Sequence, residues 1–181
     1  MKRHLVVFAK APALGQVKSR LARGIGAGPA LAFYRQTLTT LLRRAASDPR
    51  WSTILAVTPD RSAMQARRWP ARVARRGQRT GDLGQRMGRV FKHGPKGAVI
   101  IIGADIPAIT AAHIARAFHA LGAADVVLGP APDGGYWLIG ARDPARRSPL
   151  FAGVRWSSAM TRADTLRNLR RFRVALVDML D

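Results

Sequence analysis

The first loop of the chain gathers residue types that suit phosphate binding. Three cations, Lys10, Lys18 and Arg20, surround Gly15 in the stretch FAKAPALGQVKSRLA, directly after a short apolar run. An ammonium group and a guanidinium fork are common partners of phosphate oxygens, and a glycine leaves the main chain open to a ligand. The loop matches neither the Walker P-loop nor the dinucleotide-binding Gly-x-Gly-x-x-Gly pattern. We therefore expect either a phosphate cradle of another type or an ordinary surface loop with solvated cations.

A carboxylate follows the most apolar run of the sequence. Asp105 ends the stretch AVIIIGAD and is followed by Ile-Pro. An isolated carboxylate at the rim of a buried strand is costly unless a cation accompanies it. Mg²⁺, or Mn²⁺ in its place, bridges one or two carboxylates to phosphate oxygens, so Asp105 is the predicted metal ligand. The alternative is that Asp105 only caps a turn before Pro107.

A third motif, GPAPDGGYWLIG, offers a second carboxylate, Asp133, beside two glycines. Gly134 and Gly135 would let a ligand approach the main chain, and Tyr136 would line its binding site. Asp133 is the candidate general base if the acceptor is a hydroxyl group. The alternative is a plain hairpin turn, which Asp-Gly favours by itself.

Two further residues join this set on weaker grounds. Trp156, in VRWSSAMTR, would form a wall of the pocket, or else pack in the core while the serines after it cap a helix. Arg86, in TGDLGQRMG, would add a cation to the anion site, or else lie on an exposed helix face. These two residues complete the predicted site.

Hydrophobic periodicity predicts a three-layer α/β sandwich with a mostly parallel, mixed sheet. Residues 136–142 follow 125–131 too closely for a crossover helix, so this strand is expected to run antiparallel to its neighbour. Asp82 and Thr110 are the predicted N-caps of two of the helices. Strands are expected at 4–9, 52–58, 71–76, 98–105, 125–131, 136–142 and 173–180, and helices at 29–47, 82–94, 110–121 and 158–171.

Length and composition limit the classes of protein that fit. The 181 residues suit one domain, 1–181, and no apolar run is long enough to span a bilayer, so we expect a cytoplasmic protein with no membrane partner. The chain has no Cys and its four His are scattered, which excludes disulfides and thiolate zinc sites. A net charge of +21 favours an anionic partner, or arises from solvated arginines on helix faces. The arginine pairs are dispersed and no nucleic-acid-binding motif is present, so a specific nucleic-acid partner is not expected.

Taken together, the motifs resemble a known family. FAKAPALGQVKSRLA, TGDLGQRM, GADIP, GPAPDGGYWLIG and FAGVRWSS stand in the order seen in the bacterial DUF2064, or rSAM/selenodomain-associated transferase, family. That family is similar to the phospholactate guanylyltransferases and, more remotely, to the molybdenum-cofactor guanylyltransferases. The resemblance implies a nucleotide-diphospho-sugar transferase (GT-A-like) fold over nearly the whole chain.

The resemblance also implies roles for individual residues. The loop of Lys10, Gly15, Lys18 and Arg20 would hold nucleotide phosphates, Asp105 would bind the metal, and the 133–136 segment would line the acceptor or sugar side. Members of the family usually carry an Asp-Val-Asp-Thr-like segment after the last strand. Asp181 matches the first Asp of that segment.

These observations predict a Mg²⁺-dependent transferase that uses a nucleoside triphosphate or a nucleotide sugar and a small phosphorylated or hydroxyl acceptor. Three cations in one loop suit a triphosphate, so nucleotidyl transfer is favoured, with Lys18, Arg20 and Asp105 stabilising the charge that moves to pyrophosphate. Glycosyl transfer is the first alternative. A catalytically degenerate binding protein with this fold and a basic nucleic-acid-binding module are the others.

Overall fold

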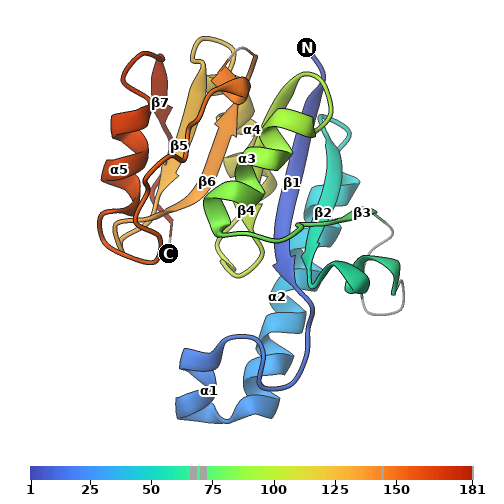
Figure 1. Cartoon of the computed structure of the whole chain (residues 1–181). Helices are drawn as coiled ribbons and strands as arrows, with labels where there is room; N and C mark the ends of the chain where they lie inside the picture. The colour runs from blue at the N-terminus through green and yellow to red at the C-terminus, as the bar shows by residue number, and fades with distance from the viewer. Residues whose placement is uncertain (66–68, 70–72, 144, 181) are drawn as a thin grey trace.

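The computed structural model describes residues 1–65, 69, 73–143 and 145–180, except the side chain at position 147. Its seven strands form one sheet (Figure 1). The strands are β1 (Arg3–Lys10), β2 (Ser52–Thr58), β3 (Ala74–Gly77), β4 (Ala98–Gly103), β5 (Val126–Pro130), β6 (Tyr136–Ala141) and β7 (Val174–Leu176). The helices are α1 (Ser19–Ile25), α2 (Ala27–Ser47), α3 (Leu83–His93), α4 (Ala111–Ala120) and α5 (Thr161–Asn168), with short 3₁₀ turns η1 (Asp60–Met64) and η3 (Ala145–Arg147).

The sheet is mixed, as predicted. Its strand order is β3-β2-β1-β4-β6-β5-β7, and β6 is antiparallel to both of its neighbours. The other pairs, β1 with β2 and β4, β2 with β3, and β5 with β7, are parallel. The carboxyl ends of β1 to β5 therefore lie at one edge of the sheet, which is where ligands bind in open α/β sheets.

Helices cover both faces of the sheet, which confirms the three-layer architecture. On one face, α2 and α4 pack against the sheet through residues such as Leu38 and Phe118. On the other face, Met87 and Phe91 of α3 pack against the sheet. The strand β4 supplies both cores, because its consecutive buried residues point alternately to the two faces. This burial explains the unbroken apolar run of residues 98–102.

Most predicted elements are present, and two predicted helix caps are confirmed. The side chain of Asp82 accepts a hydrogen bond from Gln85 N, and that of Thr110 accepts one from His113 N; both form capping boxes. The strand predicted at 71–76 is found as β3, although positions 71 and 72 lie outside the described residues. In the described part of the chain, no helix is long and apolar enough to cross a membrane.

The predicted elements differ from the structure in three places. The helix α1 is absent from the elements predicted by periodicity, because none of its residues is buried and it therefore has no apolar stripe. The helix α5 is shorter than the predicted 158–171, since the residues before it form hydrogen-bonded turns. The strand β7 covers only three residues of the predicted 173–180, although Val177 N and Leu180 N still donate to β5 carbonyls.

Candidate functional site

A hollow of about 280 Å³ lies where β1 and β4 end, and Lys10, Lys18 and Asp105 line it together. The ammonium group of Lys18 donates to the backbone oxygen of Asp105 at 3.0 Å and lies 3.5 Å from its carboxylate Oδ2. The Asp105 side chain is 58% exposed and that of Lys18 24% exposed. We call this feature the Lys18–Asp105 hollow. Two sequence motifs that are 87 residues apart thus meet at one point of the sheet edge.

The loop that carries Lys18 has an unusual backbone. Lys18 adopts φ 49° and ψ 44°, the left-handed region, immediately before α1 begins. Left-handed residues other than glycine are uncommon and cluster at functional sites. The Lys18 ammonium also lies 5.8 Å from the ring centroid of Phe33 on α2. Gly15, in the same loop, adopts φ 69°, which a glycine accepts without strain. The loop conformation therefore places the ammonium group over Asp105.

Tyr34, which sequence reasoning missed, holds the end of β1 in place. Its hydroxyl accepts a hydrogen bond from Lys10 N at 3.0 Å and donates one to Lys10 O at 2.8 Å. Burial raises the pKa of Tyr34 to about 12, partly offset by the hydrogen bond to Lys10. Tyr34 lies on the buried face of α2, so its position in the sequence indicates only an aromatic residue of the core. The available clue was chemical, because a buried tyrosine hydroxyl usually requires a polar partner.

The structure does not bring Arg20 or Arg86 into this hollow. Arg20 is exposed on α1, which extends beyond the carboxyl end of β1 (Figure 1). Arg86 lines a different and larger cavity beside α3, where its Nε donates to Gly81 O at 2.7 Å. Among the described residues, Lys10 and Lys18 are the cations that line the hollow.

The GPAPDGGY motif forms the hairpin turn between β5 and β6. Ala131 N donates to Gly135 O at 3.1 Å, and the carboxylate of Asp133 accepts from Gly135 N at 2.9 Å. Gly134 has φ 82°, and a Cβ there would lie 2.2 Å from Ala159 O, so no other residue fits. The motif therefore forms the hairpin turn that was the alternative to a ligand-binding segment. The same turn lies at the edge where β4 ends, because β6 pairs Leu138 with Ile102.

Tyr136 and Trp156 have structural partners away from the hollow. Tyr136 is half-buried beside α5, and its hydroxyl lies 3.5 Å from Thr165 Oγ1. Trp156 packs against Phe151, with ring centroids 6.0 Å apart. A Cβ at position 84 would lie 2.5 Å from the Trp156 indole, which explains why α3 begins with a glycine in its first turn. Neither aromatic residue lines the Lys18–Asp105 hollow as the structure describes it.

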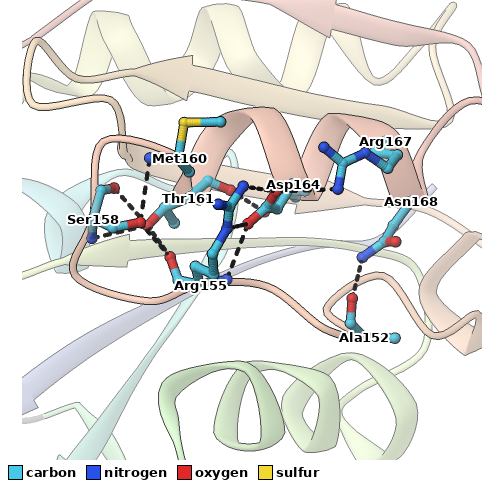
Figure 2. A network of polar contacts seen from close by, with 9 residues as sticks. Ala152, Arg155, Ser158, Met160, Thr161, Asp164, Arg167 and Asn168 are labelled. Carbon is cyan, nitrogen blue, oxygen red and sulfur yellow. Dashed lines mark hydrogen bonds and ion pairs between the residues drawn. The ribbon is translucent and has the colours of Figure 1, made fainter.

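A polar network fixes the segment that carries Trp156 (Figure 2). The buried carboxylate of Asp164 on α5 accepts hydrogen bonds from Arg155 N, Nε and Nη2 at 3.2, 2.8 and 2.9 Å. Arg167 adds an ion pair at 3.2 Å. Hydrogen bonds from Arg155 lower the pKa of Asp164 well below its usual range. Thr161 Oγ1 donates to Arg155 O at 2.7 Å, so the FAGVRWSS motif is tied to α5 at several points.

The described lining of the Lys18–Asp105 hollow offers a divalent metal one carboxylate, that of Asp105. Asp105 is half-exposed and offers oxygen ligands, which suit Mg²⁺ or Mn²⁺. Within the described residues, no three acidic or histidine side chains lie close enough together to hold an ion. Asp181 lies outside those residues. The donor set therefore fits a metal that takes most of its ligands from phosphate oxygens and water.

The family assignment follows from the sequence between α2 and α5. The family model described as "Uncharacterized protein conserved in bacteria (DUF2064)" matches residues 41–158. The chain belongs to this family. The matched part of the DUF2064 chain contains Asp105, Asp133 and Trp156, whereas the loop with Lys10 and Lys18 precedes it. No curated protein matches the chain by sequence.

Solved structures share the fold of this DUF2064 protein over almost its whole length. A protein from Desulfovibrio desulfuricans G20, assigned by name to the nucleotide-diphospho-sugar transferases, is 28% identical, with a TM-score of 0.90 over 99% of this chain and 81% of its own.

Two more distant neighbours show the fold alone. A CMP-2-keto-3-deoxy-manno-octonic acid synthetase solved with CTP is 12% identical (TM-score 0.61, 98% of this chain and 90% of its own). Glucosyl-3-phosphoglycerate synthase from Mycobacterium tuberculosis, solved with Mn²⁺ and UDP, is 10% identical (TM-score 0.60, 99% and 70%). The fold is therefore one that nucleotidyl and glycosyl transferases share.

Proposed function

We propose that this protein is a nucleotidyltransferase that uses a nucleoside triphosphate together with Mg²⁺ or Mn²⁺. The observation that carries the proposal is the Lys18–Asp105 hollow, where two lysines and a half-exposed carboxylate meet at the carboxyl ends of β1 and β4. Cations that face phosphates and a carboxylate that can share a metal with them are the elements that phosphoryl-transfer sites require. A structural neighbour binds CTP, which supports a triphosphate as the donor.

In this proposal, the lysines position the triphosphate for in-line attack. An acceptor phosphate oxygen forms a bond to the α-phosphorus while the bond from that phosphorus to the bridging oxygen breaks, and pyrophosphate leaves. Lys10 and Lys18 stabilise the negative charge that moves to pyrophosphate, and Arg20, two residues after Lys18, is the third cation available. Asp105 would hold the metal, which neutralises phosphate charge when it is bound.

The acceptor would approach from the β5–β6 turn. This turn lies at the same sheet edge as Asp105, since β6 pairs with β4. Gly134 and Gly135 carry no side chains, and their main-chain N–H and C=O groups are paired within the turn and with Arg162. An acceptor phosphate is already ionised and needs no base, whereas a hydroxyl acceptor would use the exposed carboxylate of Asp133.

Ligand-induced thermal shifts test this proposal. The panel contains the four common nucleoside triphosphates and several nucleotide sugars, each with and without Mg²⁺. A ligand at 100 times its Kd adds about 2.7 kcal/mol, which raises the melting temperature of a chain of this size by roughly 5 to 11 °C. We expect a Mg²⁺-dependent shift with one triphosphate, and we expect Asp105→Asn to abolish it.

The matched control is Asp48→Asn, at the opposite edge of the sheet, which should keep the full shift. A thermal shift with a nucleotide sugar but with no triphosphate would contradict nucleotidyl transfer and support glycosyl transfer instead. Folded protein that responds to none of these ligands would refute the proposed site.

A further inference from the structure

A second and larger hollow, of about 690 Å³, lies on the α3 side of the sheet. In Figure 1, α3 lies on the near side of the sheet, beside rather than over β2 and β3. The floor of the hollow is apolar and is formed by Val6 of β1 and by Ile54 and Ala56 of β2. The walls carry cations, namely Arg76 of β3 and Arg86 and Arg89 of α3, and His93 lies beside them. We call this feature the β3–α3 groove.

Strand register and helix periodicity aim these cations into the groove. Arg76 pairs with Ala56, so its side chain lies on the same face of the sheet as Ala56, which belongs to the core under α3. Arg86, Arg89 and His93 are spaced three and four residues apart, so they share one side of α3. The two walls of the groove are therefore both basic.

The guanidinium groups that α3 places in the groove are paired with neutral acceptors. Arg86 donates to Gly81 O and to the side-chain oxygen of Gln78, and Arg89 donates to Thr80 O. The Nε atom of Arg89 is buried and has no hydrogen-bond partner among the described residues.

The groove has little acidic charge to balance these arginines. Asp60 is the one acidic residue in its described lining, and its carboxylate accepts from the backbone N of Arg79 at 2.9 Å. Elsewhere in the molecule, partly buried arginines such as Arg142 do pair with carboxylates. Cations held close together without counter-charge repel one another, and an anion relieves this cost.

We propose that the β3–α3 groove binds a small organic ligand with two or more phosphate groups, at a site separate from the nucleotide. Arginine forks match phosphate oxygens in pairs, the apolar floor accommodates an organic body, and the volume lies in the range of small-molecule sites. The groove and the Lys18–Asp105 hollow share no described lining residue. The side chain of Gln78, in the groove lining, donates to the backbone oxygens of Ala9 and Ala56.

Titration calorimetry with inorganic tripolyphosphate in 0.2 M NaCl tests the proposal. The native protein is expected to bind this probe in the groove, and also in the hollow if the proposed function holds. The double variant Arg76→Gln/Arg89→Gln should weaken the groove site by about 10- to 100-fold, the usual worth of charge-assisted hydrogen bonds. Lys18→Gln should weaken tripolyphosphate binding only at the Lys18–Asp105 hollow. The two sets of variants therefore distinguish a failure of this inference from a failure of the proposed function.

The control is Arg43→Gln, at an exposed position on α2 on the other side of the sheet. It removes one positive charge, as Arg76→Gln does, whereas the double variant removes two. Since the Arg89 side chain is partly buried, Arg76→Gln alone serves if the double variant does not fold. Groove variants that bind tripolyphosphate as tightly and with the same stoichiometry as Arg43→Gln would overturn the proposal. A groove that binds a 12-nucleotide single-stranded RNA but not tripolyphosphate would overturn it as well.

Discussion

At the scale of single residues, the ammonium group of Lys18 and a divalent metal would compete for the carboxylate of Asp105. Its ammonium contacts both the backbone oxygen and the carboxylate of Asp105 in the free protein. A divalent ion cannot approach that carboxylate without repulsion from the ammonium. Triphosphate would attract the lysine and supply ligands for the metal at the same time. We therefore expect nucleotide and metal to bind cooperatively.

Mn²⁺ binding, followed by electron paramagnetic resonance, measures this competition. We expect the free protein to bind Mn²⁺ weakly, and Lys18→Gln to tighten that binding by about 10-fold, equivalent to about 1.4 kcal/mol. The same variant should weaken nucleotide binding, so the two effects have opposite signs. Lys10→Gln, which leaves the Lys18–Asp105 contact intact, is the matched control. Unchanged Mn²⁺ affinity in Lys18→Gln would contradict the competition.

At the scale of elements, the sequence predicted those that bury an apolar face or begin with a capping side chain. The strand β4 and the helices after Asp82 and Thr110 are examples. The helix α1 was not predictable in this way, because it buries no residue. Its position depends on tertiary contacts with α2 and on the backbone of Lys18, and periodicity carries no information about either.

The candidate site was predictable where a motif ends a strand. The sequence placed Lys18 and Asp105 in one site, and the structure brings them within 3.5 Å. The turn that Asp133 closes on Gly135 is a local contact, and the hairpin alternative anticipated it. The packing of Trp156 on Gly84 could not be predicted, because it depends on a neighbour distant in the chain. Tyr34 was missed for the same reason, because its partner is a main-chain group.

The segment before α5 gives a prediction about pH. The pKa of Asp164 is lowered in the folded chain by hydrogen bonds from Arg155. A carboxyl group with a lowered folded pKa stabilises the protein above its unfolded pKa of about 3.9, and this contribution is lost as the pH falls toward the folded pKa. Asp164→Asn should therefore lower the melting temperature by several degrees at pH 7, and by progressively less below about pH 4.

Circular dichroism melts between pH 7 and pH 3 measure this difference. Asp178→Asn is the control, since it removes an exposed carboxylate paired with Arg116 and should have little effect at any pH. A difference between native and Asp164→Asn protein that stays constant down to pH 3 would show that the network acts through packing rather than through charge.

At the scale of the whole molecule, the net charge of +21 acts on every anion in solution. This field increases encounter rates and favours nonspecific binding of polyanions, but it selects none of them. Selection requires local geometry, which the hollow and the groove supply through partly buried cations. Salt separates the two contributions, because it screens long-range attraction more than contacts at short distance.

Fluorescence anisotropy with a labelled single-stranded RNA and a labelled nucleoside triphosphate measures this separation. Between 50 and 200 mM salt, a single-stranded polyanion held by about six phosphate contacts loses about 300-fold in affinity, because each contact releases counterions. The triphosphate with Mg²⁺ makes fewer such contacts and should lose much less. Asp105→Asn should abolish binding of the triphosphate and leave RNA binding unchanged. Equal salt slopes for the two ligands, both insensitive to Asp105→Asn, would mean that the loop cations act only as surface charge.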